Sequence, residues 1–214
     1  MVRPSFGLHY ITSASLPYRG SSFCGKIADI AIYYTRHGQT DWNLDYKIQG
    51  RKDISLNETG RKEAEELQIK IQDIPLDIIY SSPLKRAYET AEIARGDRDI
   101  PLLTDNRLAE EYYGQFEGVS RHSEKYKEQR QHFFCRYPGG EGYLDVAYRV
   151  YSFLHELEET CPDKNILIVA HGGMSRVVET YFHDLNNEEF VSYMIPNCGL
   201  VRYQWPHRIV PLKQ

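Results

Sequence analysis

The chain has 214 residues, of which 41% are hydrophobic and 26% are charged, a composition that suits one domain with a single core. Its 26 basic and 30 acidic side chains give a net charge of −4, so the chain lacks the electrostatic footprint of a nucleic-acid-binding protein or of a protein that binds an anionic membrane. No apolar run approaches 18 residues, and the N-terminus lacks the apolar block of a secretory signal. We therefore expect a cytoplasmic protein that spans no membrane.

Residues 1–28 differ in composition from the rest of the chain. They contain Arg3, Arg19 and Lys26 but no acidic residue, are rich in serine, and show no apolar periodicity. Such a composition is compatible with a transit peptide, with a disordered extension, or with a translation start placed too far upstream. We expect a poorly ordered N-terminal extension followed by one domain over residues 29–214.

The first half of the domain predicts two strands and two helices. Residues 30–34 form a short apolar run bounded by polar residues, as is typical of a strand buried on both faces. Asn57 can cap a helix whose apolar positions recur at spacings of three and four: Ala64, Leu67 and Ile71. Residues 77–80 predict a second strand. The Ser-Pro pair at residues 82–83 predicts the start of a helix that Gly96 ends.

The second half continues the alternation of helices and strands. Residues 120–136 are polar and compatible with a helix, and the Pro-Gly-Gly sequence at residues 138–140 interrupts them. A long amphipathic helix follows, with one apolar face formed by Val146, Val150, Leu154 and Leu157. Residues 165–170 predict a strand, residues 174–182 a helix and residues 200–205 a last strand. This order predicts an α/β fold, a three-layer sandwich whose mostly parallel central sheet carries helices on both faces.

Two of the predicted strands end in a histidine that precedes a glycine. His37 follows Arg36 at the end of the first strand, and His171 precedes Gly172 after the strand at residues 165–170. Ligands of open α/β sheets bind beyond the carboxyl ends of the strands, where glycines and helix N-termini favour an anion. Arg86 lies in the first turn of a helix and could place its guanidinium group on two oxygens of a phosphate at the same edge.

Six ordered blocks of sequence carry a resemblance to a known family. They are RHGQT at residues 36–40 with WN at 42–43; QG at 49–50 with Asp53 and LNETG at 56–60; SSPLKRA at 81–87 with TA at 90–91; RLAE at 107–110 with Gly114 and EG at 117–118; PGGE at 138–141; and VAHGG at 169–173. Together they resemble the histidine phosphatase superfamily over residues 30–204. The glycine at position 172, where an acidic residue would indicate the acid phosphatases, places the resemblance with the phosphoglycerate mutase-like branch.

The resemblance implies a phosphoglycerate mutase-like fold and a phosphohistidine intermediate. In that scheme the neutral imidazole of His37 attacks phosphorus, while Arg36, Arg86 and a protonated His171 hold the phosphoryl oxygens. It also implies substrate contacts from three further residues: Asn43 as an uncharged donor, Gln49 on the substrate side, and Gly172.

The same resemblance assigns Glu110 as the acid that protonates the leaving oxygen and then accepts a proton from water. The adjacent Glu111 is the alternative. The arginines and the histidine supply positive charge, so we expect neither a metal nor another cofactor. Four widely spaced cysteines form no CxxC pair and predict reduced thiols: Cys24, Cys135, Cys161 and Cys198. Beside these residues, Asp53 is expected to fix loop geometry and Glu141 to belong to a helix start, where Gly142 replaces the family's usual serine.

Hydrolysis and phosphoryl shuffling are both possible within this family. Mutases carry a long insertion between the acid and the second histidine, whereas Glu110 and His171 are only 61 positions apart. They also usually lack the Gln-Gly step present at residues 49–50. These features favour a phosphatase acting on small phosphorylated metabolites, with a phosphoglycerate mutase as the alternative. A binding module without turnover would lack the nucleophile or the acid, and both are present.

Residues 119–137 are basic in an otherwise acidic chain. They hold five basic residues against Glu124 and Glu128: Arg121, Lys125, Lys127, Arg130 and Arg136. Within a small lid insertion around residues 112–143, this charge could meet a second anionic group of the substrate, or it could form a solvated helix face. Three questions stay open from the sequence: whether this segment is a substrate lid or a solvated helix face, which substrate is used, and whether the protein is a monomer or a homodimer.

Overall fold

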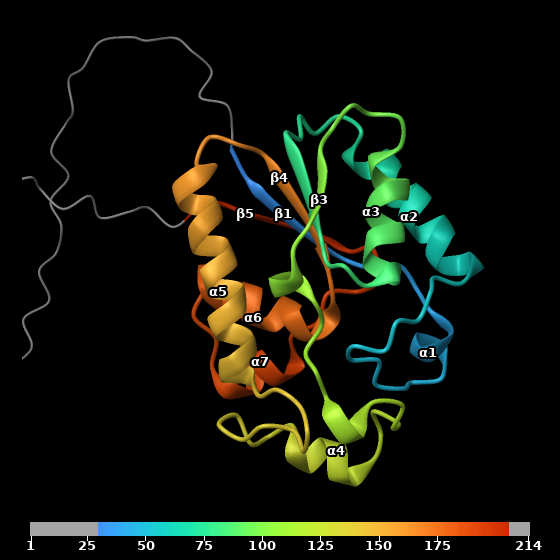
Figure 1. Ribbon diagram of the computed structural model, residues 1–214, viewed down its shortest axis with the longest axis vertical. Coiled ribbons are helices and arrows are strands. Elements are labelled where there is room, and N and C mark those ends of the chain that lie inside the picture. Colours follow the sequence, from blue (N-terminus) through green and yellow to red (C-terminus); the bar gives the residue numbers. More distant parts are fainter. Residues whose placement is uncertain (1–29, 206–214) are drawn as a thin grey trace, which may run out of the picture.

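A five-stranded sheet forms the centre of this computed structural model, which describes residues 30–205 (Figure 1). The strand order is β3-β2-β4-β1-β5. Four strands are mutually parallel: β1 (Ile32–Arg36), β2 (Ile78–Ser81), β3 (Leu102–Thr104) and β4 (Ile166–Ala170). The edge strand β5 (Leu200–Tyr203) runs antiparallel to β1. The extension expected over residues 1–28 lies outside the described residues.

The two central strands bring the two histidines together. Strands β1 and β4 are neighbours in register, with Arg36 opposite Ala170. The chain therefore leaves both strands at the same level of the sheet, and the backbone N–H of His37 donates to the carbonyl of Ala170 at 3.0 Å. Adjacent parallel strands thus place His37 and His171, which are far apart in sequence, at one edge.

Helices cover both faces of the sheet, as Figure 1 shows. Helices α2 (Glu58–Ile71) and α3 (Lys85–Arg95) pack on one face, where Leu167 and Val169 of β4 are buried. Helices α5 (Tyr143–Thr160) and α6 (Gly172–Phe182) pack on the other face, against Ile166 and Ile168. This alternation along a fully buried strand confirms the predicted three-layer α/β sandwich.

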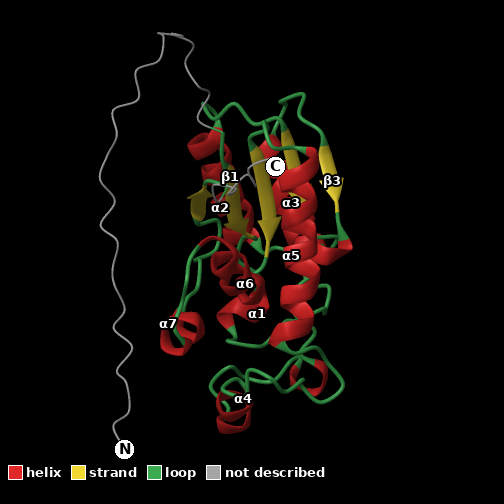
Figure 2. Cartoon of the chain, turned by 90° about the vertical axis from the view of Figure 1, so that its left-hand side faces the viewer, coloured by secondary structure: helices red, strands yellow, loops and turns green. Residues whose placement is uncertain are grey.

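Three short helices complete the described chain: α1 (Asp41–Leu44), α4 (Glu124–Gln129) and α7 (Asn187–Ser192), with 3₁₀ turns at Asn106–Leu108 and Gly114–Phe116. Helix α4 lies beyond the carboxyl edge of the sheet (Figures 1 and 2). Its buried Tyr126 packs with Ile48, Tyr113 and Tyr137 in a small cluster separate from the two main cores. No helix within residues 30–205 has the length and apolar character needed to cross a membrane.

Several local predictions differ from the structure. Helix α3 begins at Lys85 instead of residue 83, and Asp53 from a distant loop accepts the Lys85 N–H at 2.8 Å. Ser82, the predicted cap, accepts from Leu84 N–H at 3.3 Å, and its hydroxyl group also bonds to His171. Of the polar segment at residues 120–136, only α4 is helical, and strand β3 and helix α7 were not expected.

Candidate active site

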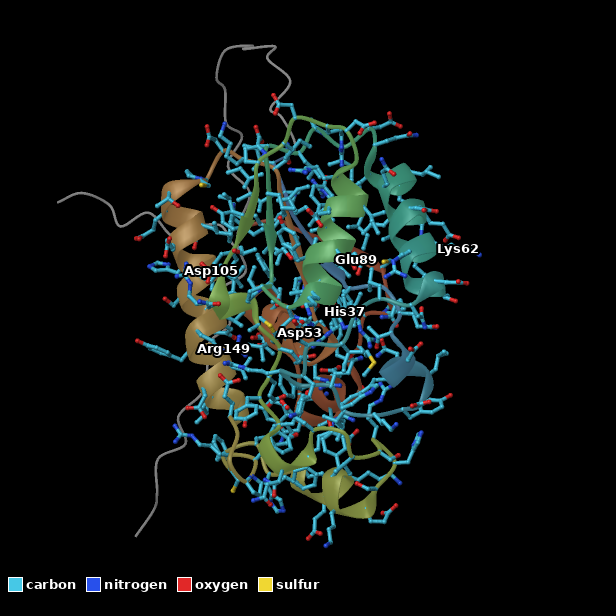
Figure 3. The ribbon with its side chains drawn as sticks, turned by 45° about the vertical axis from the view of Figure 1, so that its right-hand side comes forward. His37, Asp53, Lys62, Glu89, Asp105 and Arg149 are labelled. Atoms are coloured by element: carbon cyan, nitrogen blue, oxygen red, sulfur yellow. The ribbon has the colours of Figure 1, made fainter. Side chains whose placement is uncertain are left out.

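His37 is held with one ring nitrogen unprotonated. The side chain is 2% exposed and lies near the middle of the molecule, at the end of α3 that meets the carboxyl edge of the sheet (Figure 3). Its Nδ1 lies 2.7 Å from the carbonyl oxygen of Gly38, which can only accept, so Nδ1 carries the proton. Nε2 therefore presents a lone pair, toward which Arg86 Nε donates at 3.2 Å.

The surroundings of His37 keep the imidazole neutral. Burial, together with the positive charges of Arg86 and Arg36, lowers the pKa of His37 well below its ordinary value of 6.5. Only the bond to Gly38 acts in the opposite direction. A neutral imidazole with a fixed tautomer is the form required of a nitrogen nucleophile.

Arg86 is a fully buried cation fixed by backbone oxygens. Its NH1 and NH2 groups donate to the carbonyls of Lys52 and Gly50, each at 2.7 Å. Burial lowers the pKa of Arg86 to about 10, so the guanidinium keeps its charge at neutral pH. Its place in the first turn of α3 agrees with the sequence analysis, and its anchoring to the 50–52 loop fixes a positive charge beside Nε2 of His37.

His171 lies next to His37. Its ring centre is 5.2 Å from that of His37, and its Nε2 lies 2.7 Å from Ser82 Oγ, whereas its Nδ1 is buried without a partner. Burial and the neighbouring Arg86 and His37 lower the pKa of His171 well below 6.5. These surroundings favour the neutral ring, and the fixed positive charges beside His37 come from Arg86 and Arg36.

Glu110 is held in the cavity by two backbone hydrogen bonds. Its two carboxylate oxygens accept from backbone N–H groups, Oε1 from Glu111 at 3.0 Å and Oε2 from Gly173 at 3.1 Å. The first of these bonds is local, and the second comes from the first turn of α6. The carboxylate is thereby fixed beside the chain segment that follows His171.

A cavity of about 570 Å³, counted with the solvent at its mouth, joins these groups. Seven of the predicted site residues line it: Arg36, His37, Asn43, Gln49, Arg86, Glu110 and Gly172. His171 is fully buried behind this lining. The sequence analysis did not anticipate Lys47 or Arg176 in the wall, and of the basic segment only Arg121 and Arg130 reach it. Arg176 lies among apolar residues of α6. In the sequence, the only feature that could have indicated a site residue is a charged side chain on a helix face that is otherwise buried.

Asn43 and Gln49 are two polar residues of the cavity wall that differ in their hydrogen bonds. The side-chain oxygen of Asn43 accepts from the N–H and the hydroxyl group of Thr40, each at 3.1 Å, in a capping box that begins α1. Its amide nitrogen is therefore the group left for a ligand. Gln49 is buried, and its Oε1 has no partner among the described residues.

A sequence profile of the histidine phosphatase superfamily (branch 1) matches residues 32–211. The chain belongs to the histidine phosphatase superfamily. PhoE of Bacillus subtilis, described as an uncharacterized phosphatase, is 34% identical over 179 residues, which are 82% of this chain and 91% of PhoE. A 2,3-bisphosphoglycerate-dependent phosphoglycerate mutase of Gloeobacter violaceus is 32% identical over 185 residues, covering 81% and 84% of the two chains.

Solved structures of this superfamily share the fold. YhfR of Bacillus stearothermophilus superposes with a TM-score of 0.72 at 31% identity, covering 81% of this chain and 90% of YhfR. A mycobacterial glucosyl-3-phosphoglycerate phosphatase superposes with a TM-score of 0.73 at 26% identity, covering 81% and 89%. The predicted phosphoglycerate mutase-like α/β fold is thus confirmed, and the relatives of this histidine phosphatase superfamily member include both phosphatases and mutases.

Proposed function

We propose that this protein is a phosphatase that hydrolyses small phosphomonoesters through a phosphohistidine on Nε2 of His37. The observation that carries the proposal is the unprotonated Nε2, fixed by the Gly38 carbonyl through Nδ1 and placed 3.2 Å from the Arg86 guanidinium. A buried nucleophile beside a fixed cation suits attack on an anionic phosphate. A cytoplasmic location and small phosphorylated metabolites as partners belong to the same proposal.

The reaction divides into two displacements at phosphorus. In the first, the lone pair of Nε2 of His37 forms the N–P bond, the bond from phosphorus to the ester oxygen breaks, and Glu110 in its acid form gives that oxygen its proton. In the second, Glu110 takes a proton from a water molecule, the water oxygen bonds to phosphorus, and the N–P bond breaks. The products are an alcohol and inorganic phosphate, and both residues return to their starting forms.

Two arginines balance the charge of the phosphate. Arg86 is held at the nucleophile, and Arg36 extends from the end of β1 with NH1 near the carbonyl of Ile195 at 3.4 Å and with Nε buried without a partner. These groups stay in place as negative charge shifts among the oxygens, so little reorganisation is needed in the transition state. Because arginines supply this charge, we propose hydrolysis that requires no metal ion.

Hydrolysis is favoured over transfer between hydroxyl groups by the short distance in sequence between the acid and the second histidine. Only 61 positions separate Glu110 from His171, and a single six-residue helix, α4, lies beyond the sheet edge in this stretch. So short a segment gives less protection of a phosphohistidine from water than a long insertion. The alternative is a phosphoglycerate mutase, and it is an outcome of the following test.

A panel of phosphometabolites tests the proposal. Phosphate release and phosphoglycerate interconversion are measured for the purified chain in the presence of a chelator, with the His37→Ala variant as the control. We expect chelator-resistant phosphate release that exceeds interconversion and that His37→Ala abolishes. Interconversion that exceeds release would favour the mutase. Activity that disappears with the chelator and returns with magnesium would refute the metal-independent mechanism, and binding without any turnover would indicate a module that only binds.

A further inference from the structure

Glu141 binds two arginines that lie outside the catalytic cavity. Its Oε1 accepts from Arg51 NH2 at 3.1 Å and from Arg149 Nε at 3.0 Å. Its Oε2 accepts from Arg149 NH2 at 3.1 Å and from Tyr112 N–H at 2.9 Å. Neither Glu141 nor the two arginines belong to the described lining of the cavity. Any effect of Glu141 on the reaction must therefore pass through the groups that it binds.

These contacts show that Glu141 is more than part of a helix start. Helix α5 begins at Tyr143, with Gly142 as its N-cap. The carboxylate that accepts the Gly142 N–H, at 3.0 Å, is that of Asp145. Asp145 therefore caps α5, and the Glu141 carboxylate is left to bind the two arginines.

Arg149 joins Glu141 to the chain segment that ends at Glu110. Arg149 lies on α5 (Figure 3), and besides its two bonds to Glu141 it donates to three backbone carbonyls. NH2 donates to the Glu110 carbonyl at 3.2 Å, and NH1 donates to the carbonyls of Arg107 and Ala109, each at 2.6 Å. A guanidinium group has five N–H donors in a rigid plane, so the fork on Glu141 determines where the other donors point.

Arg51 binds the same carbonyl oxygen from a different part of the chain. Its Nε donates to the Glu110 carbonyl at 3.3 Å, whereas Arg149 reaches that oxygen from α5. Arg51 lies in the loop between α1 and α2. The two guanidinium groups repel each other, and the Glu141 carboxylate that both of them bind offsets this repulsion. Glu141 therefore stabilises the pair of arginines that holds the Glu110 peptide.

The main chain of Glu141 holds the segment on the other side of Glu110 and Glu111. The Glu141 N–H donates to the Tyr112 carbonyl at 2.8 Å, while its side chain accepts the Tyr112 N–H. Gly140 lies so close that a Cβ at this position would be 2.2 Å from the Tyr112 carbonyl oxygen. The Gly-Glu step at residues 140–141 thus packs directly on the backbone that follows the acid.

The geometry points to Glu141 as a positioning residue that fixes, through Arg51 and Arg149, the peptide from which the Glu110 carboxylate projects. The inference rests on the proposed function, in which Glu110 protonates the leaving oxygen. Proton transfer requires the acid within hydrogen-bond reach of that oxygen, and a displacement of about 1 Å can lower the rate about 100-fold. Glu141 touches no reacting atom and acts only on the placement of Glu110.

Glu141→Gln tests this role because both oxygens of Glu141 accept hydrogen bonds only from N–H donors. An amide has a single oxygen, and its NH2 group would face N–H groups in either orientation. The side chain keeps its size, and the main-chain bond to Tyr112 is retained. Water competes little for the lost bonds, since the side chains of Glu141 and Arg149 are 19% and 13% exposed.

The loop that holds Arg86 should stay in place in this variant. Arg86 is bound by the carbonyls of Gly50 and Lys52, and not by the side chain of Arg51. The loop also has its own anchor, because the Arg51 N–H donates to Glu117 Oε1 at 2.7 Å. We therefore expect the substitution to disturb the acid and to leave the phosphate-binding cation where it is.

Dependence on the leaving group distinguishes positioning of the acid from a general loss of structure. An alkyl phosphate such as glycerol 3-phosphate needs a proton on its leaving oxygen, whereas para-nitrophenyl phosphate needs it far less. We expect Glu141→Gln to lower kcat/KM about 10- to 100-fold for the alkyl ester, with a much smaller loss for the nitrophenyl ester. The ratio of the two values is unaffected by the fraction of folded protein, because both substrates are assayed on one sample.

Two comparisons make the kinetic test specific. Glu156→Gln removes an exposed carboxylate that pairs with Arg107 at 2.7 Å, without touching Arg51 or Arg149, and should leave the ratio at the parent value. In a Glu110→Gln background the acid is already absent, so adding Glu141→Gln should not change the ratio further. An equal loss for both esters in Glu141→Gln, no loss for either, or the full change of ratio in the Glu110→Gln background would overturn the positioning role.

Amide hydrogen exchange tests the same role without any turnover, so that its failure is separable from failure of the proposed function. The N–H groups of Glu111 and Gly173 donate to the Glu110 carboxylate and report its placement. In Glu141→Gln both should exchange about 10-fold faster, while the amides of β4 keep the parent rate and Glu156→Gln changes neither set. Unchanged exchange at Glu111 and Gly173, or an equal increase throughout β4, would overturn the inference whether or not the chain hydrolyses either ester.

Discussion

Glu111, the neighbour of the proposed acid, is buried and should control how the stability of the domain depends on pH. Its side chain is 1% exposed and its Oε1 has no partner among the described residues. Burial and the adjacent charge of Glu110 raise the pKa of Glu111 from 4.5 to about 8. The folded chain therefore keeps this carboxyl group protonated at neutral pH, whereas the unfolded chain releases the proton.

The size of the effect follows from the two pKa values. Between pH 4.5 and pH 8 the folded chain holds a proton that the unfolded chain has lost, so this group's contribution to stability falls as the pH rises. Each pH unit within that interval is worth about 1.4 kcal/mol. Glu111→Gln removes the ionisation, so the stability of this variant relative to the parent should rise by about 2 to 3 kcal/mol from pH 5 to pH 7.

Urea and thermal unfolding of the parent, Glu111→Gln and the exposed control Glu128→Gln at pH 5, 6 and 7 measure this difference. We expect the Tm difference between Glu111→Gln and the parent to grow by roughly 5 to 10 °C over this range, with no such trend for Glu128→Gln. Any constant effect of the amide on packing cancels, because only the change with pH is compared. A difference that stays constant or shrinks as the pH rises would refute a protonated buried Glu111.

Three further predictions concern activity. Glu110→Gln should lower kcat for an alkyl phosphate by about 100-fold or more, whereas Glu111→Gln should stay within a few-fold of the parent, and the reverse order would exchange their roles. Because its pKa is lowered, His37 should stay neutral below pH 6.5. The pH profile of kcat/KM, corrected for ionisation of the substrate, should therefore show no fall in activity on the acid side near pH 6.5. Such a fall would contradict the neutral nucleophile. Gly173→Ala would place a Cβ 2.6 Å from Glu110 Oε1. The kcat of this variant should fall about 100-fold while its circular dichroism spectrum stays unchanged. Full activity would contradict the close packing of the acid on α6.

The sequence was sufficient for the main elements and for the residues at the sheet edge. Apolar runs at residues 30–34 and 165–170 predict strands without any tertiary information, and parallel strands necessarily end at the same edge. The proximity of His37 and His171 follows from these two facts and from the adjacency of β1 and β4. Strand β3, with three residues, is too short to produce a periodic signal.

The features that were missed depend on contacts between distant segments. The N-terminus of α3 is capped by Asp53, more than thirty positions earlier, which no local pattern at Ser82 reveals. Arg176 and Glu141 likewise gain their surroundings from carbonyls and guanidinium groups supplied by other elements. The lowered pKa of His171 could not be predicted either, because it results from complete burial beside Arg86.

Rapid-quench trapping of the phosphoenzyme tests the central claim most directly. The parent, His37→Ala and His171→Ala are mixed with a radiolabelled phosphomonoester, quenched in alkali, and digested to locate the label by mass spectrometry. The phosphohistidine account predicts an acid-labile label on His37 in the parent, no label in His37→Ala, and slower but detectable labelling in His171→Ala. Loss of the label in His171→Ala alone, or phosphate release by the parent without any acid-labile label on His37, would contradict it.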